Sequence, residues 1–262
     1  MKKFFFYLML GCSLFISLAF AGQEKSIIFQ VATIGSLAQG VYDGDYKYGR
    51  LMKKGDLGVG TFKDLNGELV AVDGKFYQIE ASGKLNLVSA NQIVPFAEVT
   101  FFKPTMYSSV VDIVSYQNLG KVLLDKFPNK NIPYAIRIDG TFSKLKLRSL
   151  RKQKKPYPLL TQAAKEQAIF NLNHVTGTVV GFWFPTYWAG IAVPEFHLHF
   201  VTTDRTTGGH VLDIDVSKGQ VSLQPIHQVQ VYLPNTQSFA QANLSSEELN
   251  VSIKKAEGGS SQ

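Results

Sequence analysis

The stretch Phe196-His197-Leu198-His199-Phe200-Val201, followed closely by Gly208-Gly209-His210-Val211, decides what we expect of the fold. In the first segment histidine alternates with large apolar residues, which is typical of a β-strand whose successive side chains point to opposite faces. Residues 203–209 are rich in turn-forming types, and residues 210–216 alternate again. The sequence therefore predicts a β-hairpin that brings His210 beside His197 and His199.

Three imidazoles that converge on rigid strands favour a zinc site. Zn²⁺ binds neutral histidine nitrogens, and in catalytic sites it keeps one position for water or substrate. The alternative is that His197, His199 and His210 are packed or surface residues, as single histidines on strands usually are. The other two histidines, His174 and His227, have no histidine partners at such spacing. We interpret those two as structural or surface residues.

The N-terminus has the composition of a secretory signal peptide. Met1-Lys2-Lys3 is basic, residues 4–18 are apolar, and Ala19-Phe20-Ala21 is a small-x-small cleavage site. We expect residues 1–21 to be removed and the mature protein to be exported, either to the periplasm or out of the cell, without a stable membrane anchor. A lipoprotein acylated at Cys12 is the alternative, and it would leave an apolar run in the mature chain.

Length and composition set limits on the size, the charge and the possible metal ligands of the mature chain. Removal of residues 1–21 leaves 262 − 21 = 241 residues, enough for one large domain or two small ones, and lowers the net charge from +7 to +5. The only cysteine, Cys12, lies in the signal peptide, so the mature chain forms no disulfide and a metal site must use histidine and carboxylate ligands. The basic run Lys144 to Lys155 has no interleaved aromatic residues, which speaks against nucleic-acid binding.

Strand patterns dominate the mature chain, and we predict a mixed α/β (α+β) fold. Asn66-Gly67 and Asp73-Gly74 are type I′ turn signals between three successive strand candidates. Helical spacing predicts a helix over Ser109 to Phe127, and shorter helices near residues 34–40 and 159–167.

Several motifs together resemble the α-acetolactate decarboxylase family. They are Gly55-Asp56-Leu57-Gly58-Val59-Gly60-Thr61-Phe62, Asn66-Gly67-Glu68-Leu69-Val70-Ala71-Val72-Asp73-Gly74-Lys75-Phe76-Tyr77-Gln78, Tyr134-Ala135-Ile136-Arg137-Ile138-Asp139-Gly140, the histidine hairpin, and Leu233-Pro234-Asn235-Thr236. The resemblance spans about residues 36–257. It implies a homodimeric zinc enzyme that converts 2-acetolactate to acetoin and CO₂. It also implies two sheet-based regions, which we place approximately at residues 22–130 and 131–262, with the zinc-binding hairpin in the second.

The resemblance assigns roles to seven residues. The implied zinc ligands are His197, His199 and His210. The implied catalytic residues are Arg148, Glu68 and Glu257, and Thr61 is implied to line the substrate site together with Arg148.

The chemistry of 2-acetolactate fits these residue types. Its ketone lies β to the carboxylate and can accept the electrons released as CO₂ leaves, and zinc bound through the hydroxyl and ketone oxygens would stabilise the resulting enediolate. Arg148 suits the carboxylate or the developing oxyanion because its charge does not titrate away. Glu68 or Glu257 would deliver the proton, and the sequence does not distinguish them. The alternatives are an exported zinc hydrolase, although no HExxH motif is present, and a metal-binding module without enzymatic activity.

Overall fold

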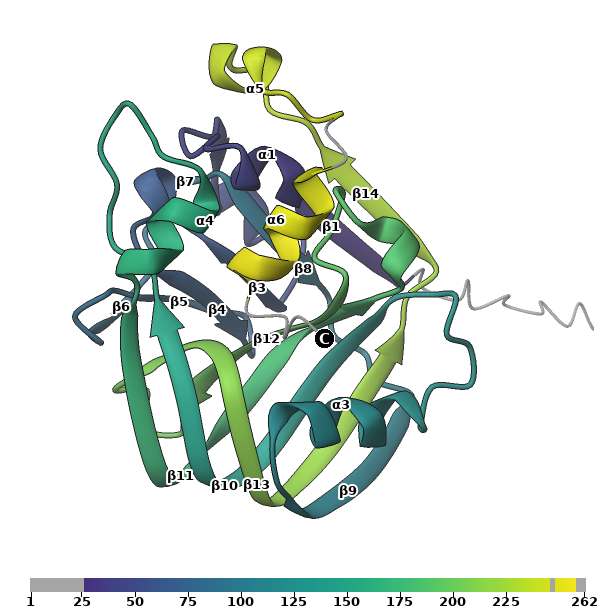
Figure 1. Cartoon of the computed structure of the whole chain (residues 1–262). Helices are drawn as coiled ribbons and strands as arrows, with labels where there is room; N and C mark the ends of the chain where they lie inside the picture. The colour runs from purple at the N-terminus through teal and green to yellow at the C-terminus, as the bar shows by residue number, and fades with distance from the viewer. Residues whose placement is uncertain (1–25, 246–247, 258–262) are drawn as a thin grey trace, which may run out of the picture.

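The computed structural model describes residues 26–245 and 248–257, which fold around two β-sheets (Figure 1). One sheet has seven strands in the order β14-β1-β8-β3-β4-β5-β6. Its only parallel pair among the described residues is β1 with β14. The strands are β1 (Ile27–Val31), β3 (Leu57–Thr61), β4 (Glu68–Val72), β5 (Lys75–Ile79), β6 (Leu85–Leu87), β8 (Phe96–Thr100) and β14 (Gln228–Tyr232).

The second sheet has five longer strands. They are β9 (Met106–Ile113), β10 (Tyr134–Ser149), β11 (Ala168–Phe184), β12 (Glu195–Thr202) and β13 (Gly208–Pro225). Strands β10, β11, β12 and β13 each pair with two of the others and so form a ring of antiparallel pairings, while β9 adds to β13. A separate two-stranded ladder joins β2 (Tyr46–Lys47) and β7 (Ile93–Val94). The expected mixed α/β class is confirmed, and sheet dominates it.

The points where the chain passes from one sheet to the other do not coincide with the approximate division between residues 130 and 131. Strand β9 precedes that division but pairs with β13, and β14 follows it but pairs with β1. Each sheet is therefore completed by a strand from the other half of the sequence.

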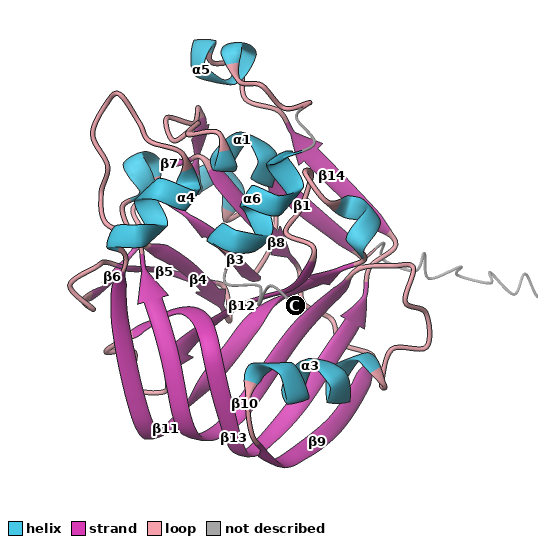
Figure 2. Cartoon of the chain, in the orientation of Figure 1, coloured by secondary structure: helices cyan, strands magenta, loops and turns pink. Residues whose placement is uncertain are grey.

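Helices cover the outside of the sheets (Figure 2). Helices α1 (Ile34–Ala38), α4 (Leu160–Ala163) and α6 (Glu248–Ala256) pack together in one apolar cluster, and α3 (Tyr116–Leu124) packs on the five-stranded sheet. The short helices predicted near residues 34–40 and 159–167 are confirmed by α1 and α4. The remaining helical segments are α2 (Tyr48–Leu51), α5 (Gln237–Gln241), η1 (Lys63–Leu65), η2 (Ala164–Glu166) and η3 (Thr186–Trp188).

The prediction of one helix over Ser109 to Phe127 is wrong in its first part. Residues 106–113 form β9, where Val110 is buried and Val111 is 56% exposed, which is the alternation of a strand. The helix begins only at Tyr116, where the Ser115 hydroxyl accepts the N–H of Asn118. Pairing of β9 along β13 supplies backbone hydrogen bonds that the local helical spacing did not reveal.

Apolar side chains from both sheets fill the space between them. Val59 and Val70 of the seven-stranded sheet share one buried cluster with Val180, Phe182 and Val201 of the other sheet. Because alternate residues of a strand face opposite sides, this cluster identifies which positions on each strand face the opposite sheet.

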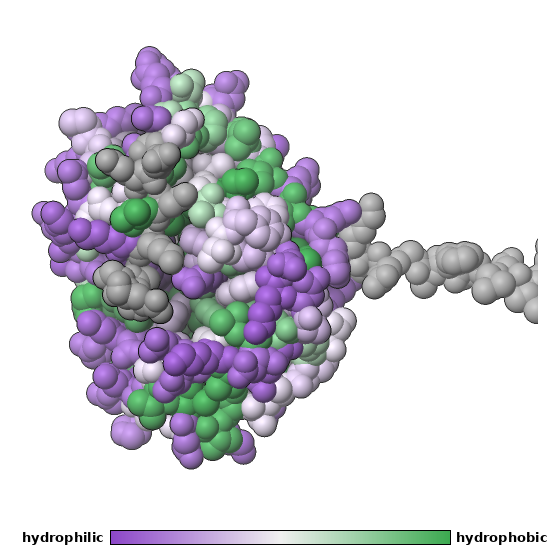
Figure 3. Space-filling model, turned by 45° about the vertical axis from the view of Figure 1, so that its right-hand side comes forward, coloured by the Kyte–Doolittle hydropathy of each residue, from purple (hydrophilic) through white to green (hydrophobic). Residues whose placement is uncertain are grey.

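The face of the molecule in Figure 3 carries mainly hydrophilic residues, and apolar residues gather on it in several separate areas. Within the described part of the chain, no helix has both the length and the apolar composition needed to cross a membrane.

Candidate metal centre and active site

The predicted histidine hairpin is present. Strands β12 and β13 pair so that His210 lies opposite His199, and on the other side of β13 His210 lies opposite Arg148 of β10. Gly209 next to it has φ of 151°, and a Cβ atom there would come within 2.6 Å of the Arg148 carbonyl oxygen. A glycine is therefore required for β13 to approach β10 this closely.

Because alternate residues of a strand point to opposite faces, the histidine side chains point toward the seven-stranded sheet. His197 and His199 share a face of β12 with Val201, which lies in the cluster between the sheets, whereas Leu198 and Phe200 face the core beneath α3. The relative exposure is 4% for His197, 0% for His199 and 2% for His210. All three imidazoles are thus enclosed between the sheets.

The ring nitrogens face one another at the spacing of metal ligands. His199 Nε2 lies 3.2 Å from His197 Nε2 and 3.2 Å from His210 Nδ1. In a tetrahedral site with Zn–N bonds of about 2.0–2.1 Å, two ligand nitrogens are roughly 3.3 Å apart. His199 Nδ1 faces the Leu69 carbonyl at 2.7 Å, and His210 Nε2 faces the Glu257 carbonyl at 3.2 Å. If these outer nitrogens carry the protons, the inner ones present their lone pairs to a common point.

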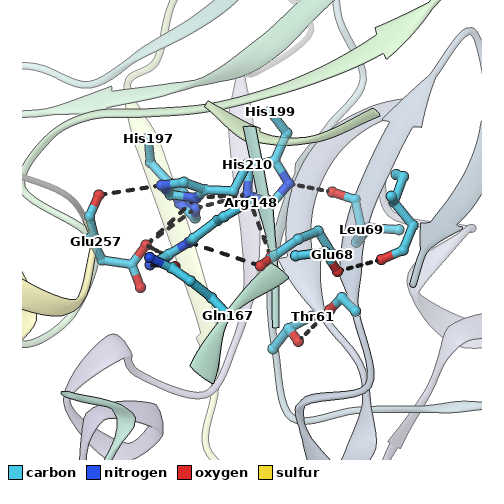
Figure 4. A network of polar contacts seen from close by, with 12 residues as sticks. Thr61, Glu68, Leu69, Arg148, Gln167, His197, His199, His210 and Glu257 are labelled. Carbon is cyan, nitrogen blue, oxygen red and sulfur yellow. Dashed lines mark hydrogen bonds and ion pairs between the residues drawn. The ribbon is translucent and has the colours of Figure 1, made fainter. Parts of the chain in front are cut away.

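Two carboxylates and one guanidinium surround the histidines (Figure 4). Glu257 Oε2 lies 3.7 Å from His210 Nδ1 and 3.8 Å from His197 Nε2, while Glu68 Oε2 lies 3.9 Å from His199 Nε2. Arg148 lies between the two glutamates, with Nη2 at 3.0 Å from Glu257 Oε2 and Nε at 4.0 Å from Glu68 Oε1. The structure therefore brings together six of the seven residues predicted for the site.

Arg148 is buried and held by several acceptors. Its Nη1 donates to the Ala256 carbonyl and lies 3.4 Å from Gln167 Oε1, in addition to the Glu257 contact. Its Nε has no hydrogen-bond partner among the described residues and is directed toward Glu68. One guanidinium donor thus remains available next to the histidines.

Thr61, the seventh predicted residue, is buried on β3 opposite Glu68 of β4. Its hydroxyl donates to the Gly67 carbonyl at 2.7 Å. This bond supports the turn that leads into Glu68. A role for Thr61 in substrate binding stays a prediction.

The charges of the enclosed groups fit a divalent cation. The buried Glu68 and Glu98 and the partly buried Glu257 carry three negative charges when ionised, and Arg148 carries one positive charge, so the balance is −3 + 1 = −2. Without a further cation, burial raises the pKa of Glu68 to about 7, although Arg148 opposes the shift, and burial also raises the pKa of Glu98. A 2+ ion held by the histidines would offset the excess negative charge.

The donor set is also suited to a metal because two of the imidazoles stay neutral. Burial, chiefly, and nearby cationic groups place the pKa of His199 and that of His210 well below the ordinary value. For His197, burial lowers the pKa, but the surrounding carboxylates of Glu98, Glu257 and Glu68 outweigh it and raise the pKa overall. Metal ligation requires the neutral form of histidine, which His199 and His210 already favour.

A cavity of about 160 Å³ leads to Arg148 from the side of α4 and α6. Gln167 and Ala256 line it beside Arg148, and the exposed Lys165 and Lys255 lie at its rim. Its positive rim suits the approach of a small anion.

Glu98 is the site residue that the sequence reasoning missed. It lies on β8, and the signal available in the sequence was a single carboxylate within an otherwise apolar and hydroxyl-bearing run. His174 and His227 are exposed and lie on other segments, as expected for surface residues.

Comparison with known proteins identifies the family of the chain. A family model described as alpha-acetolactate decarboxylase matches residues 28–246. The alpha-acetolactate decarboxylase of Brevibacillus brevis is 42% identical over 220 residues, which are 84% of this chain and 77% of that protein. The enzyme of the same name from Klebsiella aerogenes is 36% identical over 237 residues, covering 90% of this chain and 91% of that protein.

A solved structure gives the same result for the fold. The crystal structure of alpha-acetolactate decarboxylase from Bacillus subtilis strain 168 superposes with a TM-score of 0.87 at 40% sequence identity, covering 89% of this chain and all of that one. The chain described here therefore belongs to the alpha-acetolactate decarboxylase family and is a carboxy-lyase.

Proposed function

We propose that this protein is a zinc-dependent acetolactate decarboxylase, which converts 2-acetolactate to acetoin and CO₂ with His197, His199 and His210 as the metal ligands. The observation that carries the proposal is the meeting of three buried imidazole nitrogens at one point, with Arg148 and two carboxylates beside them. A bound Zn²⁺ would supply Lewis acidity toward the substrate oxygens that receive electrons during decarboxylation.

Arg148 is the group that we propose for the anionic end of the substrate. It lines the cavity, and its unpartnered Nε–H is directed toward Glu68. A buried guanidinium keeps its charge and forms strong charge-assisted hydrogen bonds with carboxylates. Arg148 would hold the substrate carboxylate until CO₂ leaves.

Glu68 and Glu257 are the two candidates to deliver the proton that replaces CO₂. Each has an oxygen within 4.0 Å of a histidine nitrogen and of Arg148, on opposite sides of that arginine. Because protonation from one side gives one acetoin enantiomer, the enantiomeric purity of the product reports the donor. In Glu68→Gln and Glu257→Gln proteins with full zinc content, the variant that releases CO₂ but gives less enantiomerically pure acetoin identifies it.

Acetoin production from racemic 2-acetolactate, measured with and without a chelator, tests the proposed function. We expect activity to be lost with the metal and restored by adding Zn²⁺. Tight zinc binding without acetoin production would instead favour the metal-binding module, and hydrolysis of another small substrate would favour the zinc hydrolase.

Export and dimer formation remain part of the proposal. Residues 1–21, which carry the proposed signal peptide, lie outside the described residues. A homodimer is supported by apolar side chains exposed on β9, where Tyr107 is 72% and Val111 is 56% exposed. The molar mass of the purified mature protein, measured by light scattering, tests the dimer.

A further inference from the structure

Glu98 is a charged residue in the middle of an interior strand. It lies on β8 between Gln30 of β1 and Val59 of β3, and its exposure is 0%. Its strand neighbours Ala97 and Val99 belong to the cluster on the outer face of the sheet, so Glu98 faces the histidines. Among the described residues neither of its carboxylate oxygens has a hydrogen-bond partner.

A buried carboxylate without a partner is costly, so its surroundings must explain it. The imidazole of His197 faces it, with Nδ1 at 3.7 Å from Glu98 Oε2. His197 Nδ1 is itself without a hydrogen-bond partner among the described residues. Two unsatisfied groups of complementary character therefore face each other across a gap slightly longer than a hydrogen bond.

The other two histidines show what this pairing does. His199 and His210 each direct the outer ring nitrogen toward a backbone carbonyl, that of Leu69 and that of Glu257. The outer nitrogen of His197 has no carbonyl partner among the described residues and faces the Glu98 carboxylate instead. Glu98 thus occupies for His197 the place that a carbonyl occupies for each of the others.

We propose that Glu98 is a positioning residue for the metal centre: its carboxylate accepts the Nδ1–H of His197 and keeps the Nε2 lone pair directed at the metal. The inference rests on the proposed metal centre. A movement of about 1 Å would bring the 3.7 Å separation to ordinary hydrogen-bond length. A carboxylate also raises the basicity of the ligand more than a carbonyl does, and it contributes negative charge close to the cation.

A positioning role and a purely structural role of Glu98 predict different results when Glu98 is replaced. They differ in the stability of the metal-free protein and in its affinity for the metal. Replacing a buried carboxylate that lacks good partners with an apolar residue of similar size should leave the metal-free protein equally or more stable, because a desolvated charge is removed. The same replacement removes the acceptor that orients His197, so metal affinity should fall. A structural residue would lower stability and leave the affinity of the folded protein unchanged.

The test uses the full mature chain with Glu98→Gln and Glu98→Leu. Zinc affinity is measured by competition with a chelator, and the stability of the metal-free protein is measured by urea unfolding. We expect zinc to bind about 10- to 100-fold more weakly to Glu98→Leu than to wild type, the usual effect of losing such a partner, with metal-free stability no lower than wild type. Glu98→Gln keeps a carbonyl oxygen that can accept the Nδ1–H but loses the negative charge, so its zinc affinity should lie between those of Glu98→Leu and wild type.

Thr100→Val is the matched control. Thr100 is buried on the same face of β8, but its hydroxyl donates to the Ile27 carbonyl, away from the histidines. This variant should lower the stability of the metal-free protein and leave zinc affinity unchanged. Zinc affinity of Glu98→Leu within twofold of wild type would overturn the role of Glu98 alone. A wild-type protein that binds no zinc would overturn the metal centre itself, so the two failures are distinguishable.

Discussion

Replacement of Arg148 by lysine separates substrate recognition from metal binding. The guanidinium of Arg148 engages Glu257 Oε2 at 3.0 Å and the Ala256 carbonyl together, and its Nε–H faces the site. Lysine keeps the positive charge, but its single ammonium group cannot reach these positions at once. Loss of one charge-assisted hydrogen bond costs about 1.5–3 kcal/mol. We therefore expect kcat/KM for 2-acetolactate to fall roughly 10- to 150-fold.

The assay is initial-rate acetoin formation, with zinc content measured on the same samples. Zinc content should stay near wild type because arginine is not a metal ligand. Arg151→Lys is the control, since Arg151 is exposed and its Nε donates only to the Glu166 carbonyl. Equal and small losses of kcat/KM in the two variants would refute the reasoning and remove Arg148 from the substrate site.

Three further outcomes follow from the same structure. The purified mature protein should carry about one zinc per chain, and His210→Ala should lose most of it by elemental analysis; full metal content would contradict the hairpin site. N-terminal sequencing of the exported protein should find Gly22 as the first residue, whereas a lipid-modified Cys12 would support the lipoprotein alternative. Ile253→Ala, which removes a buried side chain of α6, should cost roughly 2–5 kcal/mol of local packing and lower kcat/KM by loosening Glu257, with zinc retained; unchanged kinetics would show that α6 does not position that glutamate.

The hairpin was predictable because its evidence is local. Alternation of His197 and His199 with apolar residues fixes a strand and its two faces, and the glycine-rich turn fixes the return of His210. Arg148 and Glu68 could be identified as site residues only through the resemblance to a family. Each stands in a segment whose sequence is equally typical of an ordinary polar strand or turn. Their burial depends on which sheet covers them, and that is a long-range property.

The segment at residues 109–115 was misassigned for the same reason, because its structure depends on residues far away in the chain. Its apolar spacing fits a helix, yet β9 pairs with residues 216–223, which lie about a hundred positions later in the chain. Glu98 was missed because the local alternation of polar and apolar residues predicts that it faces water on the exposed side of a strand. Both faces of β8 are in fact covered, so the same pattern places a carboxylate in the interior.

The proposed metal centre is therefore a product of the docking of the two sheets rather than of the hairpin alone. The three histidines come from β12 and β13, but the groups that face their outer nitrogens come from β4, from β8 and from the residue after α6. A hairpin detached from the seven-stranded sheet would keep the three histidines and lose the acceptors that fix their tautomers. Metal binding and sheet docking should thus stabilise each other, because the ion binds the docked arrangement in preference to the separated one.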